Sequence, residues 1–540
     1  MAFITEKQQS IPNNMNTTTV GSGELVEVHQ GDTLHTDRKS RQKLFWGCFI
    51  VLVASAFGFV FRSFLMAQWG VQFGLSKTQQ GEIFGVSFWP FGISIVLFSF
   101  IIDKVGYKKS MIFAFVCHIA SVVLTIMANG YWMLYVGTLL FALGNGAAEA
   151  VVNPVVATMF AKDKTKWLNI LHAGWPTGMV LAGLLGIGMI HLELRWEIII
   201  GFILLPVIVY GWLIMNRNFP VNERVKAGIS YLEMLKEVGV LGILIIVALC
   251  AFQLGSLFGW SHTVSGLITA AIVGVFGFFV RSLGRPLFIM LLLLMIPLAT
   301  TELGTDSWIT DLMTPEMAKV GFQGGWVLVY TSVIMAVLRF YSGPIVHKFS
   351  PLGLLAVSAF VAAAGLQLLS YSAGIVIIVA ATIYALGKTF FWGTMLGVVS
   401  EQFPKGGALA LNFTGAVGQV GVGVIGAVFL GAIQDKELDQ NLAVYDRQHQ
   451  TELHMNYITE EKTGLFGEYK ALDADKLENA SPETLQTIAA AQDEAKKDAL
   501  RTVALLPALM FVVYLGLMFY YRSKGGYKPV VILEEERLNE

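Results

Sequence analysis

Fourteen long apolar runs, separated by polar segments, dominate this 540-residue chain. A helix that crosses a bilayer needs about 20 mostly apolar residues, and each run is close to that length. Hydrophobic residues make up 55% of the chain and charged residues only 14%, which is less charge than soluble domains carry. The chain is therefore predicted to be an all-α membrane protein with spans at 44–66, 80–102, 109–128, 131–160, 167–191, 195–215, 238–255, 264–281, 284–303, 322–346, 352–371, 374–400, 407–433 and 500–521.

The distribution of Lys and Arg predicts the orientation of these spans. Basic residues precede the first span and recur in every second loop, whereas the short loops on the other side hold only Lys77, Arg195 and Lys319. Loops rich in Lys and Arg stay in the cytoplasm. The first 43 residues contain no apolar segment typical of a cleaved signal peptide, so the first span is expected to remain as an anchor. We expect a multi-pass protein of the cell (inner or plasma) membrane with both termini in the cytoplasm.

An internal repeat divides the chain. Ala-Leu-Gly at 142–144 recurs at 385–387, and Leu-Asn at 168–169 recurs at 411–412 with the same displacement of 243 residues. A constant displacement through successive spans indicates two parallel six-helix halves, with the seventh and eighth spans inserted between them.

The repeat and the polar segments together give a domain organisation. The segment 434–499 is dense in Asp, Glu, Lys and Gln, and Ser-Pro-Glu at 481–483 is typical of a helix start. We expect this segment to be a solvated helical insertion. The expected parts are a disordered cytoplasmic tail at 1–43, an N-terminal half at 44–215, a connector with the two inserted helices at 216–281, a C-terminal half at 284–521 that includes the extracytoplasmic loop 434–499, and a cytoplasmic tail at 522–540.

Two parallel six-helix halves related by an axis along the membrane normal describe the major facilitator architecture. The loop Asp-Lys-Val-Gly-Tyr-Lys-Lys at 103–109 resembles the motif that this family carries between its second and third helices, although Tyr107 replaces a basic residue. The resemblance implies that Asp103 is a gating residue whose ion pair holds the cytoplasmic face closed. An ordinary basic turn is the alternative.

A narrower resemblance lies in the fourth and fifth spans. Ala-Glu-Ala-Val-Val-Asn-Pro at 148–154 and Leu-Asn-Ile-Leu-His at 168–172 are similar to paired elements of the fucose permease branch of sugar:proton symporters. The resemblance implies that Glu149 is the protonatable carboxylate and that His172 contacts the substrate.

The physical position of Glu149 supports the same role. It lies about 25 Å along its helix from the outer face, where an ionised carboxylate is costly. Such a group can take up and release a proton as its access to water changes, although a structural hydrogen-bond network is an alternative. The neighbouring Asn153-Pro154 pair should free a backbone carbonyl and bend the helix.

The chain departs from the fucose permease pattern at two places. The first span contains no carboxylate, and Ser63 follows Arg62 where the branch has an Asp. Trp175 replaces an Asn that contacts sugar in that branch. Coupling then uses Glu149 alone, a different ion or no ion, and the solute is not expected to be fucose.

Other intramembrane polar residues have open roles. Arg62 is the repeat-mate of Asp306, so Arg62 with Asp306 or Glu302 is a candidate ion pair at the outer gate, and snorkelling of Arg62 is the alternative. Lys388 is the repeat-mate of Asn145. It is expected to pair with Glu149, to bind an anionic substrate group or to form a structural ion pair.

These observations give one set of candidate site residues. Trp392 is the repeat-mate of Glu149 and is expected either to stack on a sugar ring or to pack against other side chains. Asn412 is the repeat-mate of the Asn at 169. The proton-coupling candidate is Glu149, the substrate-binding candidates are Asn145, Asn153, His172, Trp175, Lys388, Trp392 and Asn412, and the gating candidates are Arg62, Asp306, Glu302 and Asp103.

The sequence thus predicts a secondary transporter, not an enzyme, that imports a sugar or similar small polar solute with protons by alternating access. A drug:proton antiporter is the alternative, but its fifth-span motif is absent, with Met179 in place of the Pro. A non-transporting receptor on the same fold is a second alternative. We expect a monomer in the lipid bilayer with no cofactor and no metal, and the net charge of −1 gives no reason to expect nucleic-acid binding.

Overall fold

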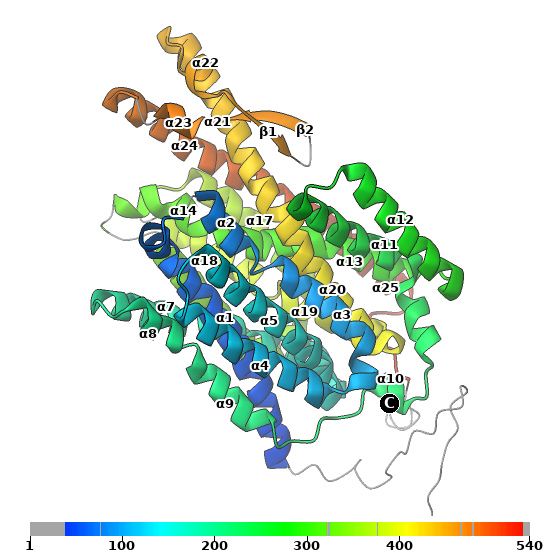
Figure 1. Ribbon diagram of the computed structural model, residues 1–540. Helices are drawn as coiled ribbons and strands as arrows, with labels where there is room; N and C mark the ends of the chain where they lie inside the picture. The colour runs from blue at the N-terminus through cyan, green and yellow to red at the C-terminus, as the bar shows by residue number, and fades with distance from the viewer. Residues whose placement is uncertain are drawn as a thin grey trace, which may run out of the picture.

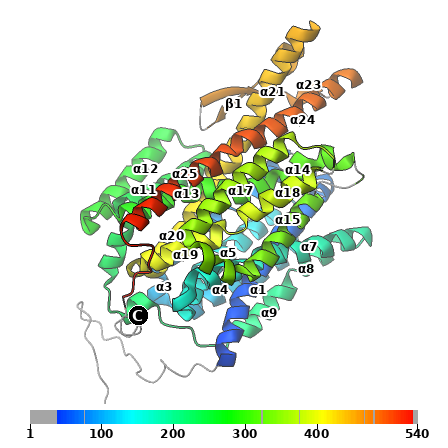
Figure 2. The same ribbon diagram turned by 180° about the vertical axis from the view of Figure 1, so that it is seen from behind.

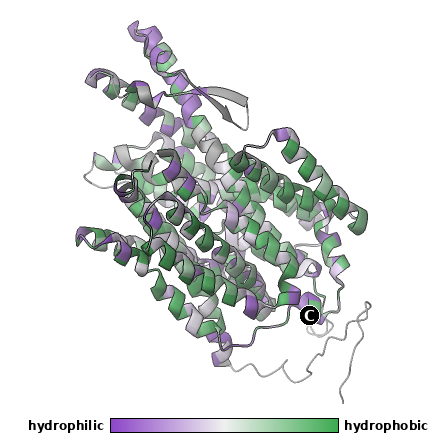
Figure 3. Ribbon diagram, in the orientation of Figure 1, coloured by the Kyte–Doolittle hydropathy of each residue, from purple (hydrophilic) through white to green (hydrophobic). Residues whose placement is uncertain are grey.

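The structure, a computed structural model, describes residues 38–532 apart from residues 76, 320, 322–324, 375, 465–466 and 478–479. Within this part of the chain, 13 helices are long and apolar enough to cross a membrane, and a bent pair raises the number to 14. The bent pair falls on the expected span at 322–346. Apolar residues concentrate in the helical bundle (Figure 3), and the expectation of an all-α membrane protein is confirmed.

The N-terminal half forms six spans, three of which are broken into shorter helices. The second span breaks before α3, where Pro90 sits in the first helical turn and needs no N–H partner. The elements of the N-terminal half are α1 (Arg38–Gln72), α2 (Lys77–Gly85), α3 (Trp89–Val105), α4 (Tyr107–Ile126), α5 (Tyr131–Met159), η1 (Ala161–Asp163), α6 (Lys164–His172), α7 (Gly174–His191), α8 (Trp196–Gly201) and α9 (Leu204–Ile214).

Helix α1 begins at Arg38, before the expected start of the first span at residue 44. The side chain of Arg41 donates a hydrogen bond to the Met159 carbonyl and lies 5.6 Å from the centre of the Phe160 ring. These contacts extend the helix into a segment that composition alone assigned to the polar tail. Residues 1–37 of that tail lie outside the described residues.

The C-terminal half repeats the arrangement with more interruptions. The bent pair α15 and α16 turns by 70° at Tyr341. The elements of the C-terminal half are α13 (Pro286–Ala299), η2 (Thr300–Gly304), α14 (Thr305–Ala318), α15 (Gly325–Phe340), α16 (Ser342–Phe349), α17 (Pro351–Tyr371), α18 (Val376–Lys388), α19 (Phe391–Gln402), η3 (Pro404–Gly406), α20 (Gly407–Gly421), η4 (Val422–Gly426), α21 (Ala427–His449) and, after an insertion, α25 (Leu505–Ser523).

Helix packing repeats between the halves. Helix α1 packs on α7 as α13 packs on α20, and α4 packs on α5 as α17 packs on α18. Across the interface the pairs are again equivalent, with α3 against α20 and α7 against α15. The internal repeat read from the sequence is therefore a repeat of three-dimensional packing, as the major facilitator architecture requires.

The two inserted helices follow a short connector helix, α10 (Glu223–Lys226), and are α11 (Tyr231–Phe258) and α12 (His262–Val280). Helix α11 begins before the expected seventh span at 238–255 and bends at Gly239 with φ 64°. A Cβ at Gly239 would lie 2.0 Å from the Gly284 nitrogen, so the close backbone crossing requires glycine. Helix α12 leaves an apolar face exposed, with Phe278 at 69% and Phe279 at 70%.

The insertion between α20 and α25 is folded rather than an open loop. It contains the outer part of α21, α22 (Leu453–Tyr457), the antiparallel strands β1 (Glu460–Gly464) and β2 (Gly467–Ala471), α23 (Ala474–Leu477) and α24 (Pro482–Val503). The expected helix start is confirmed, since the Ser481 side chain accepts a hydrogen bond from the Thr484 amide. The two short, charged strands were not expected from the sequence.

The insertion has its own small core and is tied to the bundle. Leu438, Leu442 and Ile488 are buried in this core. The Lys497 ammonium of α24 lies 2.8 Å from the carboxylate of Glu316, a buried residue of α14. Figures 1 and 2 show the insertion at the end of the bundle opposite the C terminus. We call the end at which α1 begins the terminal face and the opposite end the far face.

The orientation predicted by the basic loops can be tested with single cysteines. In a background with Cys48, Cys117 and Cys250 replaced, Gln448→Cys on the exposed end of α21 should react with a membrane-impermeant maleimide in intact cells. The exposed Lys524→Cys should react only after permeabilisation, which makes it the matched control. The reverse pattern would invert the topology, and labelling is measured by the mass shift of the purified protein.

Candidate functional site

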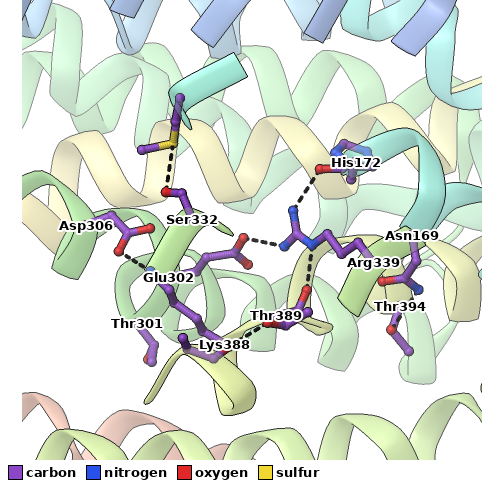
Figure 4. A network of polar contacts seen from close by, with 12 residues as sticks. Asn169, His172, Thr301, Glu302, Asp306, Ser332, Arg339, Lys388, Thr389 and Thr394 are labelled. Carbon is purple, nitrogen blue, oxygen red and sulfur yellow. Dashed lines mark hydrogen bonds and ion pairs between the residues drawn. The ribbon is translucent and has the colours of Figure 1, made fainter. Parts of the chain in front are cut away.

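A buried guanidinium connects the two halves at the centre of the bundle. Arg339 of α15 donates to the Glu302 carboxylate (2.7 Å), to the Thr389 carbonyl (2.6 Å) and to the His172 carbonyl of the other half (2.9 Å). Figure 4 shows the arginine between these three acceptors. Arg339 is 1% exposed, so its charge is stabilised by these three protein acceptors and not by water.

A second buried ion pair joins Lys388 of α18 to Asp306 of α14. The Lys388 ammonium also lies 4.8 Å from the centre of the Tyr384 ring. Of the three roles considered for Lys388, the ion pair within the C-terminal half is formed, and the pairing with Glu149 is not. Lys388 is fully buried, and a buried ammonium group needs a partner of opposite charge, which Asp306 supplies.

A π-helical segment positions both carboxylates. Glu302 lies within η2 and Asp306 follows it by one turn, directly after Pro297 has interrupted the hydrogen bonds of α13. The hydroxyl of Thr301 donates to the Pro297 carbonyl, and the Tyr384 hydroxyl donates to the Thr301 carbonyl. Local departures from α-helical pitch of this kind are frequent at functional sites.

The ion pair expected between Arg62 and Asp306 or Glu302 is not formed in this conformation. Both carboxylates are held by cations of their own half, Lys388 and Arg339. Arg62 instead donates to the Gly58 carbonyl (3.1 Å) and to the hydroxyl of Ser121 (2.7 Å). Equivalence in the repeat did not bring these residues together, because both carboxylates are paired within the C-terminal half and Arg62 bonds to Ser121 in the N-terminal half.

Arg62 is buried against an aromatic ring. Its guanidinium lies 4.5 Å from the centre of the Phe141 ring, and the residue is 2% exposed. Its Nε is buried and has no hydrogen-bond partner. Snorkelling to the interface, the alternative considered for this residue, is therefore wrong.

Glu149 lies in α5 and is surrounded by neutral groups. Asn153 approaches its carboxyl at 3.5 Å, and the Trp392 side chain also interacts with it. Asn153 in turn bonds to a ring nitrogen of His172 at 3.0 Å. Glu149 is 5% exposed, and none of the described residues offers it a cation within ion-pair distance.

The proline beside this group has the effect expected from the sequence. Pro154 has no N–H, so the Ala150 carbonyl four residues earlier loses its helical donor. The side-chain amide of Asn412, from α20 in the other half, donates to that carbonyl at 3.0 Å. Asn412 is thus an interhelical contact and does not line the cavity described next.

A cavity lies between the halves, toward the far face. Four candidate residues line it, namely Arg62, Asn145, Trp175 and Asp306. Glu149, Asn153, His172, Lys388, Trp392 and Asn412 lie outside the lining. The other lining residues are Ser55, Gly58, Phe59, Ser87, Phe88, Phe91, Thr138, Phe141, Ala142, Met179, Leu303 and Gln419.

Aromatic rings form one wall of this cavity. The Phe59 ring centre lies 5.8 Å from that of Trp175 and 5.8 Å from that of Phe88. Sequence reasoning identified Trp175 but missed the phenylalanines. The chain has 37 of them, and no local signal separates those that line the cavity from those that pack.

Asn145 connects the cavity with the polar residues behind it. Its side-chain oxygen accepts a hydrogen bond from Ser55 (2.7 Å) and contacts a ring nitrogen of His118 (3.0 Å). The other ring nitrogen of His118 meets the Tyr210 hydroxyl at 2.8 Å. Asn145 precedes Glu149 by four residues, so one helical turn of α5 separates the cavity from that carboxyl.

Polar contacts at the terminal face join the N-terminal half to the connector and to the C-terminal half. Asp103 pairs with Arg224, a connector residue that sequence reasoning missed, and Lys164 pairs with Glu223 beside it. Thr165 of α6 donates through its hydroxyl and its amide to the Glu401 carboxylate of α19. The cavity therefore lies on the far side of a closed terminal face.

The Lys388–Asp306 pair gives a prediction for stability. Lys388→Met leaves a buried carboxylate without a cation and should cost about 3–5 kcal/mol of folding free energy. Adding Asp306→Leu should restore most of the loss, since an apolar pair needs no charge partner. Thermal unfolding of the detergent-purified protein measures both, and equal melting temperatures for the single and double variants would contradict the prediction.

Known proteins resemble the chain in sequence and in fold. The family model of the Major Facilitator Superfamily matches residues 47–303. The hexuronate transporter of Bacillus subtilis (strain 168) is 27% identical over 150 residues, which cover 27% of this chain. The match spans only 34% of the relative's own length.

Solved structures share the fold over most of both chains. The fucose:proton symporter FucP of E. coli, in its outward conformation, is 14% identical and covers 88% of this chain and 99% of its own, with a TM-score of 0.56. The proton:xylose symporter XylE is 12% identical, covers 88% and 96%, and has a TM-score of 0.59. The family-model match over residues 47–303, the repeated halves and the solved structures together show that the chain has the major facilitator fold.

Proposed function

We propose that this transporter imports a sugar or a similar small polar solute together with protons. In this proposal it acts as a monomer in the cell (inner or plasma) membrane, with both termini in the cytoplasm. The observation that carries the proposal is the position of Glu149, a buried carboxyl group with neutral partners, one helical turn from the cavity. A proton is the simplest ion that can neutralise such a group.

Burial and surroundings support a proton-carrying role for Glu149. The ion pairs of Glu302 and Asp306 keep those carboxylates charged in a fixed arrangement, which suits structure. Glu149 has only amide and indole neighbours, so its charge state is free to follow its access to water. Asn153 and His172 are the polar side chains whose hydrogen bonds would change with the charge of Glu149.

The lining of the cavity supports a polar, sugar-sized solute. The aromatic wall of Phe59, Phe88 and Trp175 offers faces for stacking, and Asn145 and Gln419 offer amide hydrogen bonds. The relatives named hexuronate, fucose and xylose transporters carry sugars or sugar acids by their names. Those names suggest the solute class for this chain.

The seal at the terminal face supports an alternating-access cycle that starts from an outward-facing state. With the terminal face cytoplasmic, the cavity opens to the outside when Asp103–Arg224 and Lys164–Glu223 are paired. Breaking these ion pairs and closing the far face would expose the solute to the cytoplasm. Asp103 is the gating residue on the cytoplasmic side, while Glu302 and Asp306 move with the π-segment that borders the cavity.

Coupling is tested by Glu149→Gln, which keeps the shape of the side chain but cannot release a proton. Proteoliposomes should lose accumulation of labelled solute against its gradient under an imposed pH gradient. Exchange between preloaded vesicles should persist, because exchange needs only the loaded carrier to reorient. The probes are labelled L-fucose, D-xylose and D-glucuronate.

The matched control is Glu197→Gln, which removes a carboxylate that pairs with Arg195 outside the buried core. That variant should transport as the unmodified protein does. Uphill uptake by Glu149→Gln would move the coupling site elsewhere, with Lys388 and Glu302 as the next residues to test.

His172→Ala should act on binding before it acts on coupling. Its ring bonds to Asn153 and lies 6.4 Å from the Trp392 ring centre, so its loss disturbs the polar layer beneath the cavity. We expect a several-fold rise in KM for uptake with pH-driven accumulation retained. A fall in maximal rate with unchanged KM would contradict this role.

A further inference from the structure

Arg62 is the one interior cation to which no carboxylate is assigned among the described residues. Its partners are the Gly58 carbonyl, the Ser121 hydroxyl and the Phe141 ring, all of them uncharged. Arg62 is 98% buried, lines the cavity and has an unpartnered Nε. An arginine remains charged, and a lone charge in a low-dielectric bundle needs a counter-charge.

The interior charges can be counted from the described spans. In the middle of the bundle, between the terminal-face residues Lys164 and Glu401 and the far-face residue Glu316, the cations are Arg62, Arg339 and Lys388, and the carboxyl groups are Glu149, Glu302 and Asp306. Glu302 and Asp306 neutralise Arg339 and Lys388 within ion pairs. Arg62 and Glu149 remain, one cation and one proton-binding carboxyl group without direct contact to each other.

Among the described residues, the one other charged side chain that lines the cavity with Arg62 is Asp306, which is already paired with Lys388. Helix α4 presents His118 and Ser121 toward Arg62, and α5 presents Asn145. Toward Glu149, α6 presents His172 through Asn153, and α19 presents Trp392. Both imidazoles are buried and hydrogen-bonded to uncharged side chains. The charge of the interior therefore depends on Glu149 and on whatever binds at Arg62.

We propose that the solute carries one carboxylate group, that this carboxylate binds Arg62, and that it alternates with ionised Glu149 as the counter-charge of Arg62. The inference rests on the proposed function and specifies its solute as a monoanion, such as a sugar acid. A planar guanidinium suits a carboxylate because it can donate two parallel hydrogen bonds, and Arg62 reaches the cavity with part of its donor set unused.

In this alternation the carrier reorients in two forms, loaded and empty, and the interior of each form has no net charge. The loaded carrier holds the solute anion and a protonated Glu149, so three cations face three anions. The empty carrier returns with Glu149 ionised, and again three cations face three anions. A carrier with solute but no proton, or with a proton but no solute, has an unbalanced charge and reorients poorly. One proton then accompanies each anion, and the proton leaves Glu149 to water on the cytoplasmic side.

Binding is tested by the thermal stability of the purified full-length protein with D-glucuronate, D-galacturonate, D-gluconate and L-lactate. D-Glucose and D-galactose are the uncharged counterparts of the two uronates. At least one acid should raise the melting temperature, and its uncharged counterpart should not. Arg62→Gln should weaken that binding roughly 10- to 100-fold, the loss expected for a charged hydrogen-bonded pair. Arg62→Lys should retain part of it, and the exposed Arg195→Gln should bind as the unmodified protein does.

Proton linkage provides a measurement that does not depend on the folding of an Arg62 variant. In the unmodified protein the acid should bind more tightly as pH falls toward 5, because protonation of Glu149 removes its competition for Arg62. Glu149→Gln should bind the acid tightly at every pH between 5 and 8. A pH-independent affinity in the unmodified protein would overturn the alternation.

Transport completes the test and separates the two proposals. In proteoliposomes a pH gradient should drive accumulation of the acid, and an inside-negative potassium diffusion potential should change the initial rate less than twofold. Strong acceleration by that potential would overturn the neutral cycle. Binding of an uncharged hexose, retained in Arg62→Gln, would overturn the carboxylate assignment and leave proton-coupled import standing. A lack of any shift with all four acids would also overturn the assignment. Acid binding through Arg62 without pH-driven uptake of any probe would instead count against the proposed function.

Discussion

The ion pair between Arg339 and Glu302 is the contact on which the centre of the molecule depends. Its arginine also donates to the carbonyl of His172, so one guanidinium holds the π-segment of the C-terminal half and the fifth span of the N-terminal half together. In a bilayer interior a charge without partners is costly, and this arginine has three. The neighbouring Lys388–Asp306 pair follows the same rule within one half.

These pairs divide the interior into a fixed part and a variable part. The fixed part neutralises itself and sets the spacing of α14, α15 and α18 around the cavity. The variable part consists of Arg62 and Glu149, which sit in the N-terminal half with uncharged partners. The proposed cycle uses both parts, because a rigid frame would remain while solute and proton change the charge of the site.

Backbone irregularities place side chains that a regular helix would direct elsewhere. Pro154 frees the Ala150 carbonyl, and Asn412 of the other half occupies it, so a helix interruption becomes an interhelical contact. Two π-segments, η2 and η4, lie against each other, and a Cβ at Gly426 would come within 2.6 Å of the Thr300 hydroxyl. Contacts of this kind bring the second half close to the site without adding charge.

The sequence by itself determined the membrane class, the approximate positions of the spans and the repeat, because hydropathy and repeated motifs are local signals. It indicated Glu149 as the residue to test. It also anticipated that Pro154 would release a carbonyl. Tertiary structure alone decided the partners. Repeat symmetry suggested Arg62 with Asp306, yet Asp306 is held by Lys388 and Asp103 by Arg224 of the distant connector. Which charges meet depends on helix rotation and on the π-segment η2, and these are settled by packing between elements far apart in the chain.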